Sequence, residues 1–345
     1  MEVKSLENNF NQINKMKPIY SLTLLSLIFL FSCKKDDPKP EEKQTNTNNS
    51  RELMYYSPSD SSIYTIDENG NNQSRLCYVK QISEIDFDYS RSTNKILYIS
   101  NQGVISNRPQ IYTSNPDGSN LSKLSNKSNQ IQSVAFSNDG MKISYFYYND
   151  SVTSGDIKIM NSDGSNEKTI SFPSTILGYF AGYLNWSPND SLILFRADVI
   201  YQDSSRKDGL FTIKTDGSSF TQILDSTLNP HYPKFSPDGS KIIFIGYNET
   251  APDINGNIYS IDANGGNLTK LTSFNRAPSG HSTNIRNLNW SADGSKIAFT
   301  SNKDTPKLSS YLGKYYEEVY VMDKDGANIT QLTNDTLYQS SPVWR

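Results

Sequence analysis

Cysteine and histidine are scarce in this sequence, with two of each among 345 residues. Two cysteines cannot build the disulfide framework that stabilises small secreted domains. Two histidines, without cysteine or acidic ligands at a characteristic spacing, do not indicate a metal site. Acidic and basic residues nearly balance, with a formal net charge of −3, so no basic surface for nucleic acid is predicted. We therefore expect no metal, no cofactor and no nucleic-acid partner.

Sequence motifs of catalysis are missing as well. No Gly-x-Ser-x-Gly elbow, Walker loop, Gly-x-Gly-x-x-Gly or His-Glu-x-x-His occurs. Turns such as 323–326 (Asp-Lys-Asp-Gly) resemble the start of a calcium loop, but Leu or Ile stands six residues after the Gly. An EF-hand places its chelating Glu there, so we predict structural turns. We expect a noncatalytic protein.

The N-terminal region has the features of a secretion signal. Lys15 and Lys17 precede a mostly apolar run, 19–31, which is shorter than the roughly 20 residues that span a bilayer and fits a signal-peptide core. The run ends in Leu-Phe-Ser-Cys at Cys33. This segment resembles the lipobox of bacterial lipoproteins, which implies lipidation of Cys33.

These features predict three regions. Residues 1–32 are a lipoprotein signal peptide, with Met16 as the possible true start, and 33–50 are the lipidated cysteine and a disordered tether without apolar residues. Residues 51–345 form one folded domain. The resemblance to lipoproteins implies a lipid anchor in the cell envelope of a Gram-negative-type bacterium, and the two lysines after Cys33 favour the outer membrane, on its periplasmic or surface side.

The folded region repeats one spacing six times. An aliphatic residue is followed by Gly seven positions later and by Leu or Ile six positions after that. The copies are Ile63/Gly70/Leu76, Ile111/Gly118/Leu124, Ile157/Gly164/Ile170, Leu210/Gly217/Ile223, Ile258/Gly265/Leu271 and Val319/Gly326/Leu332. An aromatic residue alternates with them, at Phe87, Phe136, Trp186, Phe235, Trp290 and Trp344. A fixed order repeated six times indicates a repeat protein.

One repeat predicts four antiparallel strands. In 231–272, strand-like segments alternate with turns such as Asp238-Gly239, in which Asp bonds its own backbone and Gly supplies positive φ. Four strands per unit of about 50 residues are typical of a β-propeller blade. The last unit has only a first strand, about 339–344, and the first has only the other three, about 52–78. We predict that together they complete a six-bladed all-β propeller, which removes free sheet edges.

The turn phrases carry a resemblance. Phe235-Ser-Pro-Asp-Gly-Ser-Lys-Ile and Trp290-Ser-Ala-Asp-Gly-Ser-Lys-Ile resemble the WD40-like repeats of TolB-type propellers over about 52–345. The separate N-terminal α/β domain of TolB has no counterpart where this chain has its tether. In the second unit the first hairpin, 88–94, is expected to be longer and lacks Gly, and Asp190 replaces a Gly in the fourth.

Function is expected where the connections vary. The Asp-Gly turns share one end of the blades, and the insertions fall at the other end. These insertions are 101–110, 149–156, 172–182, 197–209, 247–257, 273–286 and 302–318. Aromatic and arginine side chains suit a contact surface. The candidate binding residues are Tyr179, Tyr183, Arg196, His231, Arg276, His281, Arg286, Tyr315 and Tyr316.

Two functions remain open from the sequence. The first is a noncatalytic, membrane-tethered and monomeric scaffold that binds a protein or envelope component. The second is a glycan-binding or glycan-active propeller (a lyase or hydrolase) that uses His231, His281, Arg276 and Arg286. Acidic groups beside the histidines would favour the second, because glycoside hydrolysis needs an acid and a base within reach of one substrate.

Overall fold

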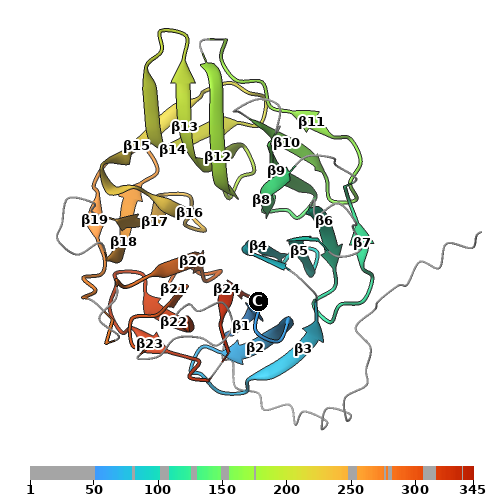
Figure 1. Ribbon diagram of the computed structural model, residues 1–345, viewed down its shortest axis with the longest axis vertical. Helices are drawn as coiled ribbons and strands as arrows, with labels where there is room; N and C mark the ends of the chain where they lie inside the picture. Colours follow the sequence, from blue (N-terminus) through green and yellow to red (C-terminus); the bar gives the residue numbers. More distant parts are fainter. Residues whose placement is uncertain are drawn as a thin grey trace, which may run out of the picture. The chain divides into compact units, whose positions relative to one another are not determined.

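The computed structural model describes residues 51–79, 82–101, 109–125, 130–148, 155–174, 176–247, 255–275, 277–278, 282–305, 316–335 and 337–345, without the side chains of 81–86, 130 and 177–181. In these ranges the regular elements are β-strands, apart from the 3-10 turn η1 (Ser226–Leu228). The strands form six four-stranded antiparallel sheets, the blades, which follow one another in a ring (Figure 1). The predicted six-bladed propeller is confirmed.

The blades contain the following strands, each from the innermost to the outermost. Blade 1 contains β24 (Ser340–Trp344), β1 (Glu52–Ser57), β2 (Ser62–Asp67) and β3 (Ser74–Tyr78). Blade 2 contains β4 (Ile82–Ser90), β5 (Lys95–Ser100), β6 (Gln110–Ser114) and β7 (Ser122–Lys123). Blade 3 contains β8 (Gln130–Phe136), β9 (Lys142–Tyr148), β10 (Gly155–Asn161) and β11 (Lys168–Thr169). Blade 4 contains β12 (Ile176–Trp186), β13 (Leu192–Tyr201), β14 (Arg206–Lys214) and β15 (Thr221–Asp225). Blade 5 contains β16 (His231–Phe235), β17 (Lys241–Tyr247), β18 (Gly256–Asp262) and β19 (Thr269–Lys270). Blade 6 contains β20 (Ile285–Trp290), β21 (Lys296–Ser301), β22 (Glu318–Asp323) and β23 (Thr330–Gln331).

Blade 1 joins the C-terminal strand to the N-terminal strands, as predicted. β24 pairs antiparallel with β1, with Trp344 opposite Leu53. Beyond the strand, the backbone N–H of Arg345 donates to the carbonyl oxygen of Glu52 at 2.8 Å. The Arg345 guanidinium also binds the Glu52 carboxylate at 2.9 Å. Blade 1 is therefore completed by a pair of strands whose partner residues lie almost 290 positions apart in sequence, as Met54 and Val343 do.

The repeated aliphatic residue is the core of each blade. All six copies, Ile63, Ile111, Ile157, Leu210, Ile258 and Val319, have no exposed surface. Each apolar cluster combines neighbouring blades; one packs Phe146 of blade 3 against Trp186 and Phe195 of blade 4. Burial of apolar surface between blades, at about 25 cal/mol per Å², therefore stabilises the ring as a whole. The side chain of Cys77 is buried in blade 1, and no disulfide bond to it is found among the described residues.

The repeated Gly makes the contact between one blade and the outer strand of the blade before it. Gly326 has a φ of +88°, and a Cβ placed on it would lie 2.1 Å from the carbonyl oxygen of Leu271. Leu271 is the last residue of the repeated spacing in the preceding blade. Here the repeated Gly of one blade therefore contacts the repeated Leu of the blade before it. The same approach brings Gly70 to Leu332, Gly164 to Leu124, Gly217 to Ser171 and Gly265 to Ile223.

The aromatic position was assigned wrongly in blade 2. Tyr89 pairs with Ile96 as Phe136 pairs with Ile143, and both are followed by a turn of equal length. Tyr89 therefore takes the place predicted for Phe87, and the first hairpin of this blade is not longer than the others. Phe87 lies two residues earlier and joins a buried cluster. Trp344 is one of the aromatic positions that were predicted correctly. Its indole N–H donates to the carbonyl oxygen of Asn289 in the neighbouring blade at 3.3 Å.

Blade 4 also differs from the prediction. Residues 176–182 and much of 197–209 were expected in loops, but they extend β12, β13 and β14 to 11, 10 and 9 residues. Alternate residues of β13, such as Ala197 and Val199, are buried, so the extension has a strand pattern. A four-residue turn, 202–205, joins β13 to β14, with the Tyr201 N–H bonded to the Ser205 carbonyl oxygen at 2.9 Å.

A buried acid lies between blades 6 and 1. Glu318 begins β22 and is 3% exposed. Its carboxyl accepts a hydrogen bond of 2.6 Å from the Thr333 hydroxyl. Burial raises the pKa of Glu318 to about 8, the charge of Asp335 adds to this, and the Thr333 bond opposes it. Because the pKa is higher in the folded state, the stability it contributes is present below about pH 4.5 and is lost as pH rises to about 8.

Replacement of Gly326 by Ala is predicted to destabilise the domain by more than about 2 kcal/mol, because the new Cβ combines a positive φ with a backbone clash. Gly239→Ala is the matched control. Gly239 also has a positive φ (+72°), but a Cβ there meets only Pro188 at 3.5 Å, so a loss of about 1 kcal/mol is expected. Urea unfolding of both variants measures the difference; equal losses would contradict the contact between blades.

Glu318→Gln is predicted to flatten the pH dependence of stability between about pH 4.5 and 8. The variant should be more stable than the parent at pH 8, by roughly 2–4 kcal/mol, because the parent must ionise a buried carboxyl. The two proteins should be similar near pH 4.5. Urea unfolding at a series of pH values tests this, and parallel curves would show that Glu318 does not titrate as described.

Candidate binding site at the loop end of the channel

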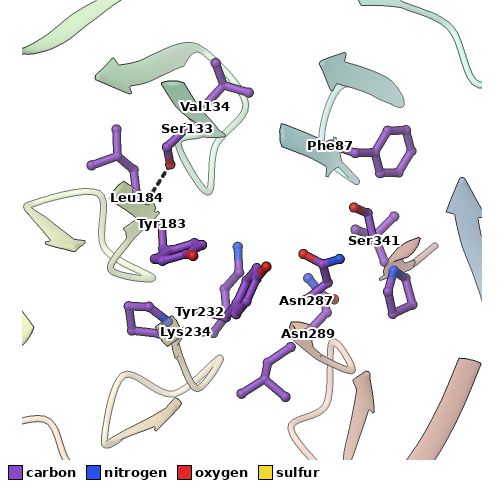
Figure 2. Close-up of a pocket in the computed structure, with 14 residues that line it drawn as sticks. Phe87, Ser133, Val134, Tyr183, Leu184, Tyr232, Lys234, Asn287, Asn289 and Ser341 are labelled. Carbon is purple, nitrogen blue, oxygen red and sulfur yellow. Dashed lines mark hydrogen bonds between the residues drawn. The ribbon is translucent and has the colours of Figure 1, made fainter. Parts of the chain in front are cut away.

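The innermost strands share a β-bulge at one level of the ring. Three residues before the aromatic position, five of these strands have a residue with positive φ, and their pairing shifts register there. These residues are Ser133, Tyr183, Tyr232, Asn287 and Ser341. Bulges re-aim side chains, and here they turn the side chains of five blades toward the central axis (Figure 2). Ser133 also accepts the backbone N–H of Leu184 in the next blade, at 2.7 Å.

This bulge level is the waist of the channel. The rings of Tyr183 and Tyr232 lie 4.4 Å apart and fill one side of it, opposite Asn287 and Ser341 (Figure 2). The cavity at the waist measures only about 40 Å³, whereas cavities of about 420 and 450 Å³ open on its two sides. The tyrosine pair therefore divides the channel into two vestibules.

The loop-end vestibule is the cavity of about 420 Å³ on the side of the varied connections. It is lined by Tyr183, Asn229, His231, Tyr232, Tyr247, Asn284 and Arg286. Blades 4, 5 and 6 contribute these residues from the beginnings of β16 and β20, the end of β17 and the bulge of β12. The three tyrosine rings can pack against a ligand, and the amide and guanidinium groups can donate hydrogen bonds to it.

His231 is fixed by two polar neighbours. Its Nε2 lies 3.0 Å from the Oδ1 of Asn229, and its Nδ1 lies 3.3 Å from the hydroxyl of Tyr183. An amide oxygen only accepts, so Nε2 carries the proton and Nδ1 accepts from Tyr183. The ring of Tyr247 meets His231 edge-on at 5.6 Å. The imidazole is held in one tautomer and one orientation.

Three titratable side chains of the vestibule, His231, Tyr232 and Tyr247, have pKa values shifted away from neutral pH toward their uncharged forms. Burial and, to a smaller extent, the charge of Arg196 lower the pKa of His231 to about 4. Burial raises the pKa of Tyr247 to about 12 and that of Tyr232 well above its usual value. A general acid or base works best with a pKa near the operating pH. These shifts suit hydrogen bonding to a neutral polar ligand better than proton transfer.

Both arginines of the site are paired with acids. The Nε of Arg286 lies 3.3 Å from the buried carboxylate of Glu317, and its Nη1 donates to the Tyr338 hydroxyl at 3.1 Å. Arg196 binds Asp208 across β13 and β14 at 3.0 Å. The Nε of Arg196 and the Oδ1 of Asp208 are buried without a hydrogen-bond partner. The charges are neutralised, and the guanidiniums are held in place.

Several predicted site residues converge. Tyr183, His231 and Arg286 line one vestibule, and Arg196 acts on His231 through its charge. Tyr316 precedes β22 and is absent from this lining. The remaining predictions, Arg276, His281, Tyr315, Cys33 and the side chain of Tyr179, lie outside the described residues.

Four residues of the lining were not predicted from the sequence: Tyr232, Tyr247, Asn229 and Asn284. One signal was available for Tyr232, which stands three residues before Phe235 as Tyr183 stands before Trp186. Among the described residues no group of three or more His, Cys, Asp or Glu is placed to hold a metal ion. Nor does this part of the chain contain a helix of the length and apolarity that a membrane crossing requires.

Comparisons with known proteins support the fold of the chain and identify no family for it. No protein family model matches the chain. An uncharacterised protein of Agrobacterium fabrum is 30% identical over 106 residues, which are 29% of this chain and 35% of that protein. The chain thus spans about a third of the length of this relative.

Several solved structures match a larger share of this chain, at sequence identities of 16% or less. TolB of Acinetobacter baumannii matches with a TM-score of 0.63 and 15% identity, over 85% of this chain and 66% of that chain. The putative TolB of Agrobacterium tumefaciens matches at 0.58 and 16%, over 84% and 91%. A chain of a nidogen/laminin complex matches at 0.58 and 10%, over 85% and 97%. The chain has the propeller fold that TolB proteins have, as the turn phrases predicted.

Tyr232→Asn is predicted to change stability by less than about 1 kcal/mol. Its φ of +51° is unfavourable for Tyr and well tolerated by Asn, so relief of backbone strain offsets the lost ring contacts. Tyr247→Asn, at the end of β17, has no such gain and should cost about 1–3 kcal/mol. Urea unfolding compares the two; an equal cost at both positions would show that the bulge is unstrained.

Proposed function

We propose that this protein is a binding scaffold of the cell envelope, and that the loop-end vestibule is the centre of its contact with a protein or an envelope component. The observation that carries the proposal is the Tyr183–Tyr232 pair. Two bulky residues with φ of 58° and 51° meet at 4.4 Å where Asn or Ser would be less strained. Backbone strain of this kind concentrates at functional sites.

The chemistry of the vestibule supports binding over catalysis. A base with a pKa of about 4, such as His231, is weak at neutral pH, and tyrosines with raised pKa values are poor nucleophiles. The lining described above contains no acidic side chain, and Glu317 is buried behind Arg286. Aromatic and arginine side chains that are already held in place are typical of interaction centres. The nidogen/laminin match offers an example of this fold within a protein complex.

The location is part of the same proposal. The apolar run 19–31 and the cysteine at position 33 support secretion and a lipid anchor, and the likeness to TolB proteins fits an envelope setting. A tether of 17 residues, 34–50, would reach at most about 56 Å. Such a length is enough to present a propeller to partners beyond the membrane surface, with the outer membrane as the proposed site.

A second candidate is glycan binding. Three tyrosine rings and the amides of Asn229 and Asn284 surround a cavity of about 420 Å³. This volume is within the range of small-molecule sites, and such a lining suits the alternating apolar faces and hydroxyls of a sugar ring. Glycan binding without hydrolysis does not require a catalytic acid and base in the vestibule.

A crosslinking experiment in the native envelope separates these outcomes. The full-length chain and its Tyr183→Asn and Tyr232→Asn variants are expressed in the source cells, treated with a short amine-reactive crosslinker and recovered by a C-terminal tag. Tyr78→Asn is the control, because Tyr78 is 55% exposed on the outer strand of blade 1. We expect one protein adduct that both vestibule variants lose and the control keeps.

The same four proteins are applied to an array of envelope glycans. Glycan binding that only the vestibule variants lose, without a protein adduct, would replace the first candidate by the second. Adducts and glycan signals that all four proteins share equally would contradict both. Melting curves of the variants show whether a loss reflects unfolding.

A further inference from the structure

The second vestibule, which we call the turn-end vestibule, lies at the opposite end of the channel from the site above and contains a lysine. Lys234 lies on β16, one residue before Phe235, and extends into the channel beside Tyr232 (Figure 2). It lines both the waist and the turn-end vestibule of about 450 Å³. Among the described residues its ammonium group makes no ion pair within 4.0 Å and no hydrogen bond. A half-buried cation of this kind is favoured by a bound anion.

Two amide groups on neighbouring blades add donors to the same cavity. Asn185 and Asn289 stand at the position of Lys234 in blades 4 and 6 and line the turn-end vestibule. The Oδ1 of Asn185 accepts the backbone N–H of Phe235 at 2.8 Å, and the Oδ1 of Asn289 accepts that of Trp344 at 3.4 Å. Because each oxygen is turned to the next blade, each amide presents its NH₂ group for donation.

One acid occupies the corresponding position of blade 2. The carboxylate of Asp88 accepts the backbone N–H groups of Phe136 and Tyr89, at 2.8 and 2.9 Å. Both oxygens are therefore occupied by the protein. Burial raises the pKa of Asp88, and the charge of Lys234 acts against this rise, so Asp88 is the acidic group that a bound anion would meet beside Lys234. Arg91, on the same blade, adds a second cation at the rim of the vestibule.

The wall around these groups is aromatic. Phe136, Trp186, Phe235 and Trp290 line the vestibule together with Pro188 and Pro237. Flat apolar side chains suit the carbon skeleton of an organic acid, while an inorganic anion would leave them solvated. The volume of about 450 Å³ is ample for such a molecule.

We propose that the turn-end vestibule binds a carboxylate with an apolar body, whose charged group meets Lys234 and the amides of Asn185 and Asn289. The ligand is either a small organic acid or the free C-terminal end of a peptide, because both offer the same group. This site is on the other side of the waist from the loop-end vestibule and does not depend on the proposed function.

Calorimetric titration of the full-length protein with benzoate tests the site. Benzamide is the neutral control and should not bind. Lys234→Met removes the cation and should weaken benzoate at least about tenfold. Lys142→Met is the matched control, because Lys142 is exposed at the same end of the blades but outside the cavity, and its affinity should equal that of the parent.

Asn185→Asp provides a second variant that should fold. The new carboxylate keeps an acceptor for the Phe235 N–H, as Asp88 does for Phe136, but replaces the donor by a negative charge. We expect at least a tenfold loss of benzoate affinity with an unchanged melting temperature. Asp88→Asn should not weaken benzoate, because it removes a negative charge.

A second titration distinguishes a small organic acid from the C-terminal end of a peptide as the ligand. An N-acetylated tripeptide ending in Phe is compared with its C-terminal amide; binding of the acid alone supports a peptide terminus, and binding of benzoate alone supports a small acid. No binding of either acid, equal binding of benzamide, or full benzoate affinity in Lys234→Met would overturn the proposal.

Discussion

The close contact between each blade and the one before it is the constraint on which the rest of this structure depends. A glycine turn of one blade approaches a backbone carbonyl at the outer edge of the preceding blade, most closely at Gly326, where a Cβ would lie 2.1 Å from the Leu271 oxygen. The contact repeats around the ring, and β24 beside β1 brings the last blade back to the first. A ring of this kind has no end at which apolar clusters are left open, so its stability belongs to the whole.

Closure also determines the character of the channel. The innermost strands are brought side by side, and a bulge at the same level of five of them directs one side chain each inward. Small residues such as Ser133 and Ser341 leave room, whereas Tyr183 and Tyr232 fill it. Two vestibules of different chemistry result. The loop end is aromatic, with its arginine paired to Glu317, and the turn end combines aromatic walls with a lysine that makes no ion pair within 4.0 Å among the described residues.

Much of the fold was predictable because its signals are local. Asp-Gly turns at a fixed period specify four strands per unit, and the lone first strand near Trp344 predicted closure. Register within blade 2 was not predictable, since Phe87 and Tyr89 are both aromatic and only pairing with Ile96 decides between them. In blade 4 the segments 172–182 and 197–209 were expected to be loops, but the strands continue through much of them.

The site was predictable in part, for a related reason. Tyr183 and Arg286 were predicted as contact residues of the varied end of the blades, and His231 was predicted because it precedes an inner strand. Tyr232 was missed because a bulge turns it inward, and bulges depend on pairing between strands rather than on composition. The neutral state of His231 likewise follows from burial, which no sequence pattern specifies.

Removal of residues 339–345 tests closure most directly. This deletion takes away β24 and leaves β1 with a free edge, so we expect loss of the cooperative thermal transition, followed by circular dichroism at 218 nm, a wavelength at which strands absorb. A chain lacking only Arg345, which loses the two contacts to Glu52, should keep a cooperative transition. If the chain without 339–345 melts as sharply and at the same temperature as the full chain, the ring does not depend on its closing strand.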